Sequence, residues 1–87
     1  MADFLICYDI RCQKRIAKFV RKLEKFAIRV EYSVFFAPNI SKDKMSEYAI
    51  ELNEVLEDED DVRIYEVEDY GIVLGNAMPL EDIFILR

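Results

Sequence analysis

The feature that most constrains the fold is a pattern of apolar residues that occurs twice along the chain. In residues 13–27 apolar side chains recur three and four positions apart, the spacing that gathers them on one face of an amphipathic helix. The same spacing returns after Ser41, which is a good N-cap with Asp43 in the first turn. The two sets are Ile16, Phe19, Val20, Leu23, Phe26 and Ala27, and Met45, Tyr48, Ala49, Leu52, Val55 and Leu56. We therefore expect two helices that bury equivalent faces.

Strand-like segments flank both predicted helices. Residues 3–9, DFLICYD, are largely apolar at both alternating sets of positions, which predicts a strand covered on both faces. Residues 28–37, IRVEYSVFFA, are rich in β-branched and aromatic residues but long for one strand. We expect a break near Ser33, and we expect Pro38 and Asn39 to end the segment. Residues 62–67, VRIYEV, predict a further strand.

This order of elements predicts an α+β, ferredoxin-like βαββαβ two-layer sandwich that occupies residues 1–87 as a single domain. Residues 70–75 could add a short strand. The run DIFIL at 82–86 is apolar on both faces and follows a unit that is already complete. We expect residues 76–87 to form an extra C-terminal strand that packs on the partner in a homodimer, because so short a chain buries little of its own surface.

The chain contains no histidine, which excludes Ser-His-Asp and Cys-His nucleophile systems and most zinc sites. Catalysis would have to use carboxylates, a metal, Tyr, Lys or Arg. Cys7 and Cys12 do not make a disulfide framework. Every apolar run is too short to span a membrane, and the first residues do not read as a signal peptide, so we expect a cytoplasmic protein with no membrane contact.

Charge is strongly divided along the chain, although its net value is −6. Residues 11–29 hold eight Lys or Arg and one acidic residue, whereas residues 43–69 hold twelve Asp or Glu and two basic residues. Five cations of the first helix fall within one stripe about 100° wide: Lys14, Lys18, Arg21, Lys22 and Lys25. This stripe could follow a DNA or RNA backbone, and the alternative is a solvated helix face. The run EDEDD at 57–61 lacks the spacing of a calcium loop and predicts a solvated acidic turn.

Asp9 is the sharpest candidate for chemistry, because it stands at the end of a strand just before a helix. It has the parity of Leu5 and Cys7, so it should lie on the sheet face opposite Phe4 and Tyr8. It could instead cap the helix or pair with a nearby Arg. One carboxylate is a poor Mg²⁺ site, but two brought together by a two-fold axis would suit one.

Three motifs in order, YDI with a basic run after it, RVEYSVF at 29–35 and VRIY at 62–65, resemble the family of the small CRISPR-associated protein two. The resemblance covers roughly residues 4–67. It implies a ferredoxin-like homodimer whose C-terminal strand typically crosses to the partner, and whose two Asp9 residues can share a Mg²⁺. Members of the family are described as metal-dependent endonucleases acting on single-stranded RNA or double-stranded DNA. They also act as a non-catalytic bridge between dimers of the CRISPR integrase.

Residue by residue, the resemblance makes Asp9 the catalytic and metal-binding position, with Tyr8 beside it. It places Lys14 and Arg15 among the basic residues that contact nucleic acid. Lys18, Arg21 and Lys22 of the stripe join this set. The family's second strand contributes Arg29 as a further nucleic-acid contact, with Ser33 and Phe35 as supporting residues.

Three functions are therefore open. The first is a phosphodiesterase in which Mg²⁺ held by Asp9 activates a water, with Arg15 and Arg29 as phosphate clamps. The second is a structural module of CRISPR adaptation, the acquisition of new spacers, that binds the integrase and DNA without cleaving it. The third is an RNase-toxin-like module outside CRISPR.

Overall fold

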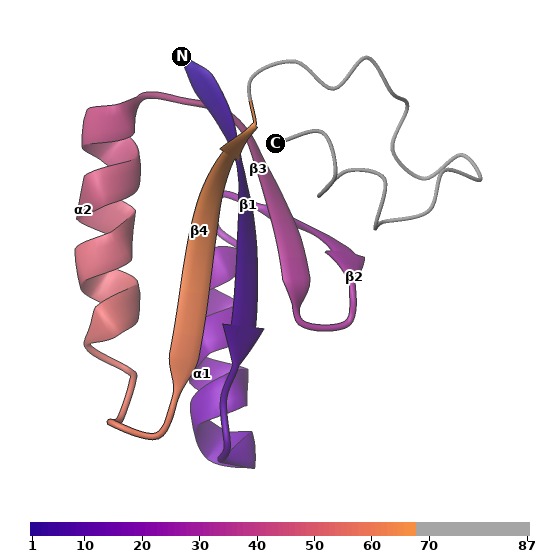
Figure 1. Ribbon diagram of the computed structural model, residues 1–87, viewed down its shortest axis with the longest axis vertical. Coiled ribbons are helices and arrows are strands. Elements are labelled where there is room, and N and C mark those ends of the chain that lie inside the picture. Colours follow the sequence, from indigo (N-terminus) through magenta and orange to yellow (C-terminus); the bar gives the residue numbers. More distant parts are fainter. Residues whose placement is uncertain (68–87) are drawn as a thin grey trace.

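The computed structural model describes residues 1–67 of the chain, in which a pair of helices covers one face of a four-stranded antiparallel sheet (Figure 1). The elements in order are β1 (Ala2–Asp9), α1 (Gln13–Leu23), β2 (Ile28–Glu31), β3 (Val34–Ile40), α2 (Lys42–Asn53) and β4 (Asp61–Val67). The strands lie side by side as β2-β3-β1-β4. The predicted ferredoxin-like α+β fold is confirmed. The strands predicted within 70–75 and 76–87 lie outside the described residues.

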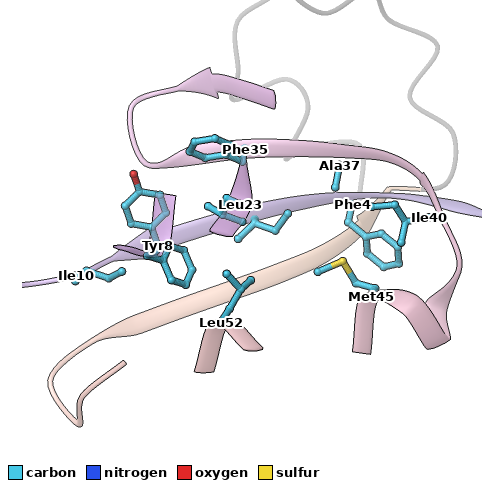
Figure 2. Packing of buried hydrophobic residues seen from close by; sticks show 11 residues of the cluster. Phe4, Tyr8, Ile10, Leu23, Phe35, Ala37, Ile40, Met45 and Leu52 are labelled. Atoms are coloured by element: carbon cyan, nitrogen blue, oxygen red, sulfur yellow. The ribbon is translucent and has the colours of Figure 1, made fainter. Parts of the chain in front are cut away.

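The main core fills the space between the sheet and the two helices (Figure 2). Phe4, Ile6 and Tyr8 point into it from alternate positions of β1 and meet Leu23 of α1 and Leu52 of α2. Phe35 contributes a fully buried ring from β3. The apolar residues whose spacing predicted the two helices are thus the residues that pack them against the sheet.

The other face of the sheet, covered by neither helix, carries a second apolar cluster, and we call it the second face. Leu5 of β1 lies at its centre, and the cluster also contains Val34, Phe36 and Val67 together with the half-buried Cys7, Val30 and Tyr65. Both faces of β1 are therefore apolar, as its sequence predicted.

Both helices end before their apolar spacing does. The first was predicted to reach Ala27, but α1 ends at Leu23, whose carbonyl accepts hydrogen bonds from the N–H groups of Phe26 and Ala27 at 3.0 and 2.9 Å. The chain after α2 behaves alike, since Val55 N–H donates to the Leu52 carbonyl at 3.1 Å. Tight turns of this kind keep the following side chains on the core side after the helix has ended.

The break predicted near Ser33 is confirmed as the turn between β2 and β3, where Ser33 has a φ of 62°. The prediction that Pro38 and Asn39 end the strand is wrong, because β3 continues to Ile40. The pairing of β1 with β3 shifts beside Asp3, and the N–H of Asn39 donates to Asp3 Oδ1 at 2.8 Å. A bulge accommodates a proline, which has no N–H for the ladder, and a residue such as Asn39 with a φ of 58°.

The predicted start of α2 is confirmed, since Ser41 Oγ accepts a hydrogen bond from the N–H of Lys44 at 3.1 Å and Asp43 lies in the first turn. In contrast, Cys12 precedes α1 and makes no capping bond with its side chain. Neither α1 nor α2 is long and apolar enough to cross a membrane.

Candidate functional site

Asp9 is the last residue of β1 and lies on the second face, as its parity predicted. Its side chain is 68% exposed. It does not cap α1, whose N-cap is Cys12, but its carboxylate lies 3.7 Å from Arg11 Nε. An ion pair this exposed contributes little to stability, so the carboxylate remains available to other ligands.

A second carboxylate lies next to Asp9 across the sheet. In the pairing of β1 with β4 the residue directly opposite Asp9 is Asp61, and directly opposed side chains share a face with Cβ atoms about 4.5–5.5 Å apart. Like charges so placed repel each other. Each has an arginine beside it, Arg11 for Asp9 and, at 3.2 Å, Arg63 for Asp61. Asp61 was missed in the sequence because it read as the end of the acidic run, and only the strand register reveals its neighbour.

The two carboxylates suit a magnesium ion. Mg²⁺ in proteins is usually held by one or two carboxylates, several waters and the phosphates of a substrate. Asp9 and Asp61 are exposed enough to admit such waters and phosphates. Within residues 1–67 no group of three or more Asp, Glu, Cys or His side chains is placed to hold a metal. A site with more than this pair of protein ligands would need residues from a second copy or from outside the described segment.

The predicted basic stripe is present on the side of α1 turned away from the core, except that Lys25 follows the end of the helix at Leu23. Lys14, Lys18, Arg21 and Lys25 are exposed and Lys22 is half-buried. None of these five side chains forms an ion pair within residues 1–67. Their charges are therefore uncompensated locally, which favours attraction to a phosphate backbone.

Arg15 lies apart from this stripe. Its side chain is only 20% exposed, with Nε 2.8 Å from Asp60 Oδ2 and Nη2 2.7 Å from Glu59 Oε2. The guanidinium thus ties the first turn of α1 to the loop that precedes β4. Contact between Arg15 and nucleic acid stays a prediction, and it would require the guanidinium to leave both carboxylates.

Asp60 is the centre of this cluster, and the prediction of a solvated acidic turn is wrong for it. Its side chain has 0% exposed surface. Besides Arg15, it accepts hydrogen bonds from the backbone N–H of Arg11 at 3.1 Å and of Glu57 at 2.9 Å. The hydrogen bonds from Arg15 hold the pKa of the Asp60 carboxyl well below its usual 3.8. The cluster joins the β1–α1 turn to the start of β4, the two segments that carry Asp9 and Asp61.

Replacing Asp60 with alanine is expected to lower the Tm by about 5 °C or more at pH 7, because two backbone N–H groups and Arg15 lose their acceptor. The matched control is Asp58→Ala, which removes an exposed carboxylate from the same turn. The folded-state pKa of Asp60 is depressed, so its contribution is fully present above the unfolded pKa and is lost as pH falls below about 3.8. Thermal denaturation should therefore show a gap between the two variants that is constant from about pH 5 to 7 and narrows below about pH 4. Equal Tm values at pH 7 would contradict the role given to Asp60.

The supporting residues predicted from the second strand meet at the β2–β3 hairpin. Tyr8 N–H donates to the Ser33 carbonyl at 3.1 Å, and the Arg29 guanidinium carbon lies 5.1 Å from the ring centre of Phe35. Figure 2 shows the Tyr8 and Phe35 rings on the helix-covered side of the sheet. Burial raises the pKa of the Tyr8 phenol, and the charge of Arg29 offsets some of the rise. This group therefore lies on the face opposite Asp9 and does not share its site.

Fold and site together define a small ferredoxin-like domain with a carboxylate pair on its uncovered sheet face and a basic helix on the other side. Residues 1–72 match the family described as CRISPR associated protein Cas2, and the chain belongs to this family. The resemblance drawn from YDI, RVEYSVF and VRIY is confirmed.

The similarity extends to individual proteins. The chain is 36% identical over 74 residues to the CRISPR-associated endoribonuclease Cas2 1 of Nitrosomonas europaea, a match that covers 83% of this chain and 69% of the relative. Its fold matches the hypothetical protein TT1823 of Thermus thermophilus with a TM-score of 0.76 and 26% identity, over 86% of this chain and 92% of that one. It also matches a chain of a partial Cas6-RT-Cas1–Cas2 complex with a TM-score of 0.69 and 28% identity, over 79% and 81% of the two chains.

Proposed function

We propose that the protein acts in CRISPR adaptation as a nucleic-acid-binding homodimer that partners the integrase, and that it is a Mg²⁺-dependent endonuclease acting at Asp9. The observation that carries the proposal is the exposed pair of Asp9 and Asp61 on the second face. The name of the Nitrosomonas relative supports endonuclease activity, and the Cas1–Cas2 assembly of a structural relative supports an integrase partner. Membership of the family favours this setting over a toxin-type RNase outside CRISPR.

A homodimer joined through the second face would bring the acidic sites of two subunits toward a common axis. In support, the apolar cluster of this face continues to Ile28, the cross-strand partner of Phe36, which is 62% exposed on β2. Exposed apolar side chains beside an apolar cluster are the usual material of a subunit contact. Two subunits would then offer two copies of the Asp9–Asp61 pair.

The chemistry follows from the residues at this site. Mg²⁺, when bound, supplies positive charge against the scissile phosphate and lowers the pKa of a coordinated water. Asp9 and Asp61 would provide carboxylate oxygens for the ion. Arg11 and Arg63 stand beside them and could turn to phosphate oxygens of the substrate once the carboxylates are engaged. Because the chain has no histidine, no imidazole takes part as a general base.

A second function, a non-catalytic adaptor, is favoured by one specific observation. The basic stripe of α1 lies on the helix side of the sheet, whereas Asp9 lies on the second face. Nucleic acid held along the stripe would therefore not lie against the carboxylates of the same subunit. Binding and cleavage could be separate properties of the two faces.

A Mg²⁺ titration separates the two functions. We expect the wild-type protein to cleave single-stranded RNA or duplex DNA with a rate that rises with Mg²⁺ and falls to background in EDTA. Product formation on gels is the measurement, with the oligomeric state followed by sedimentation in the same buffers. Binding without cleavage at any Mg²⁺ concentration would contradict the endonuclease and leave the adaptor.

A further inference from the structure

The outer surface of the helix layer is divided into a basic half and an acidic half. The basic half is the stripe of α1. On α2 and at its C-cap, four exposed carboxylates project roughly opposite the buried Met45 and Leu52, and we call them the acidic stripe: Asp43, Glu47, Glu51 and the C-cap residue Glu54. Ile50, 66% exposed, lies among them. Glu47 has Lys44 at 3.6 Å, and the other three carboxylates make no ion pair within residues 1–67.

At one end of each helix these charges do not serve the stability of the helix that carries them, whereas Arg21 and Lys22 at the end of α1 and Asp43 at the start of α2 have the favourable sign. A helix favours acidic residues in its first turn and basic residues in its last. The first turn of α1 has no acidic residue and contains Lys14. The last turn of α2 has no basic residue, and Glu51 and Glu54 stand at that end. Charges of the unfavourable sign at one end of each helix call for a partner outside the helix.

The topology makes the two stripes complementary to each other in a second copy. β1 and β3 are antiparallel, and each is followed by its helix, so α1 and α2 run antiparallel beside each other on the same sheet face (Figure 1). Stacking of Phe26 on Tyr48, with ring centres 3.9 Å apart, joins the turn that follows α1 to α2. A two-fold axis parallel to the helices, placed between two such layers, puts each α1 over the α2 of the other copy in antiparallel orientation.

In that arrangement the unfavourable ends meet. The Lys14 end of α1 lies over the Glu51 and Glu54 end of the second copy's α2, and the Arg21 end lies over Asp43 and Glu47. A two-fold axis perpendicular to the helices, lying between the two layers, would instead place the basic stripe of one copy over the basic stripe of the other, and acidic over acidic. Repulsion between like charges opposes that arrangement. The two-fold contact is isologous, so each pairing occurs twice.

We propose that the helix layers of two copies of this chain associate face to face about such an axis, the basic stripe of each against the acidic stripe of the other. This contact is separate from the second face and does not depend on the endonuclease or adaptor function. It covers the α1 stripe, so if the stripe also binds nucleic acid, a polyanion will compete with the second copy. The protein would then hold its nucleic-acid face covered until DNA or RNA is present.

Sedimentation equilibrium of the full chain tests the contact without nucleic acid. At about 0.05 M salt the protein should form a larger species than the one it forms at about 0.5 M salt. The dissociation constant of this additional step should be at least about tenfold lower at the lower salt concentration. Two charge reversals, Lys14→Glu with Lys18→Glu and Glu51→Lys with Glu54→Lys, should each abolish this salt-sensitive step. Both place charges of the favourable sign at a helix end, so loss of the helix would not account for the result.

The decisive measurement mixes the two reversed variants. Each variant alone repels itself, but an equimolar mixture should regain association, because in the mixed pair both helix contacts again join basic residues to acidic ones. A control, Glu57→Lys with Asp58→Lys, makes the same change in net charge as the acidic reversal, at exposed positions outside the two stripes and outside the second face, and should associate as wild type does. A wild-type mass independent of salt, association that survives either reversal, or a mixture that stays dissociated would overturn the proposal. If only the acidic reversal abolished the salt-sensitive association, the acidic stripe would have a basic partner other than the α1 stripe. That result would also overturn the proposal.

Discussion

Replacing Asp9 with asparagine is expected to lower Mg²⁺-dependent cleavage by about a hundredfold or more, because the change removes the carboxylate charge that would hold the metal. The fold should be unaffected, since the Asp9 side chain is 68% exposed and its ion pair with Arg11 is 3.7 Å long. The measurement is the initial cleavage rate over a range of Mg²⁺ concentrations, on single-stranded RNA and on duplex DNA.

Two further variants sharpen the result. Asp61→Asn should raise the Mg²⁺ concentration needed for half-maximal rate by about tenfold or more, since Asp61 lies directly opposite Asp9 in the sheet. Asp58→Asn removes an exposed carboxylate from the turn before β4 and should leave the rate unchanged. Cleavage by Asp9→Asn at the wild-type rate, with the oligomeric state preserved, would remove Asp9 from catalysis and leave the adaptor function.

The sequence predicted the fold because its helical and its strand periodicities indicated the same buried core. The helical spacing of residues 16–27 and 45–56 fixed which faces are buried, and the double-sided apolar pattern of residues 3–9 placed β1 inside the sheet. The same parity argument placed Asp9 on the second face. The alternation of apolar and polar residues predicts which face each side chain occupies, because that face follows from the local geometry of the helix or strand.

The pairing of residues distant in sequence could not be predicted in this way. Asp61 joins the candidate site only through the register of β4 against β1. Arg15, a predicted nucleic-acid contact, is engaged by Asp60 of the loop before β4, with Nε 2.8 Å from Asp60 Oδ2. Both effects depend on how segments about fifty residues apart align, which hydrophobic spacing does not encode. The end of β3 was misplaced for a related reason, since the bulge at Pro38 forms in the pairing with β1, where the N–H of Asn39 donates to Asp3 Oδ1.

The largest expected effect on nucleic-acid binding comes from reversing charge at the start of the basic stripe. Lys14→Glu with Lys18→Glu should weaken binding to duplex DNA by about a hundredfold at about 0.1 M salt, because both lysines are exposed and neither has an ion-pair partner within residues 1–67. The slope of log affinity against log salt should become shallower by about 0.9 for each lost phosphate contact. Fluorescence anisotropy across a salt series measures both quantities.

Lys42→Glu with Lys44→Glu is the matched control for this binding experiment. It makes the same change in net charge in the first turn of the other helix, at lysines that already pair with Glu66 and Glu47 at 3.4 and 3.6 Å. If binding depended only on overall charge, the two double variants would weaken it equally. If it depends on the stripe, the control keeps most of the wild-type affinity and its salt slope. Equal losses would mean that α1 presents no nucleic-acid site, and the adaptor function would then lose the observation that favours it.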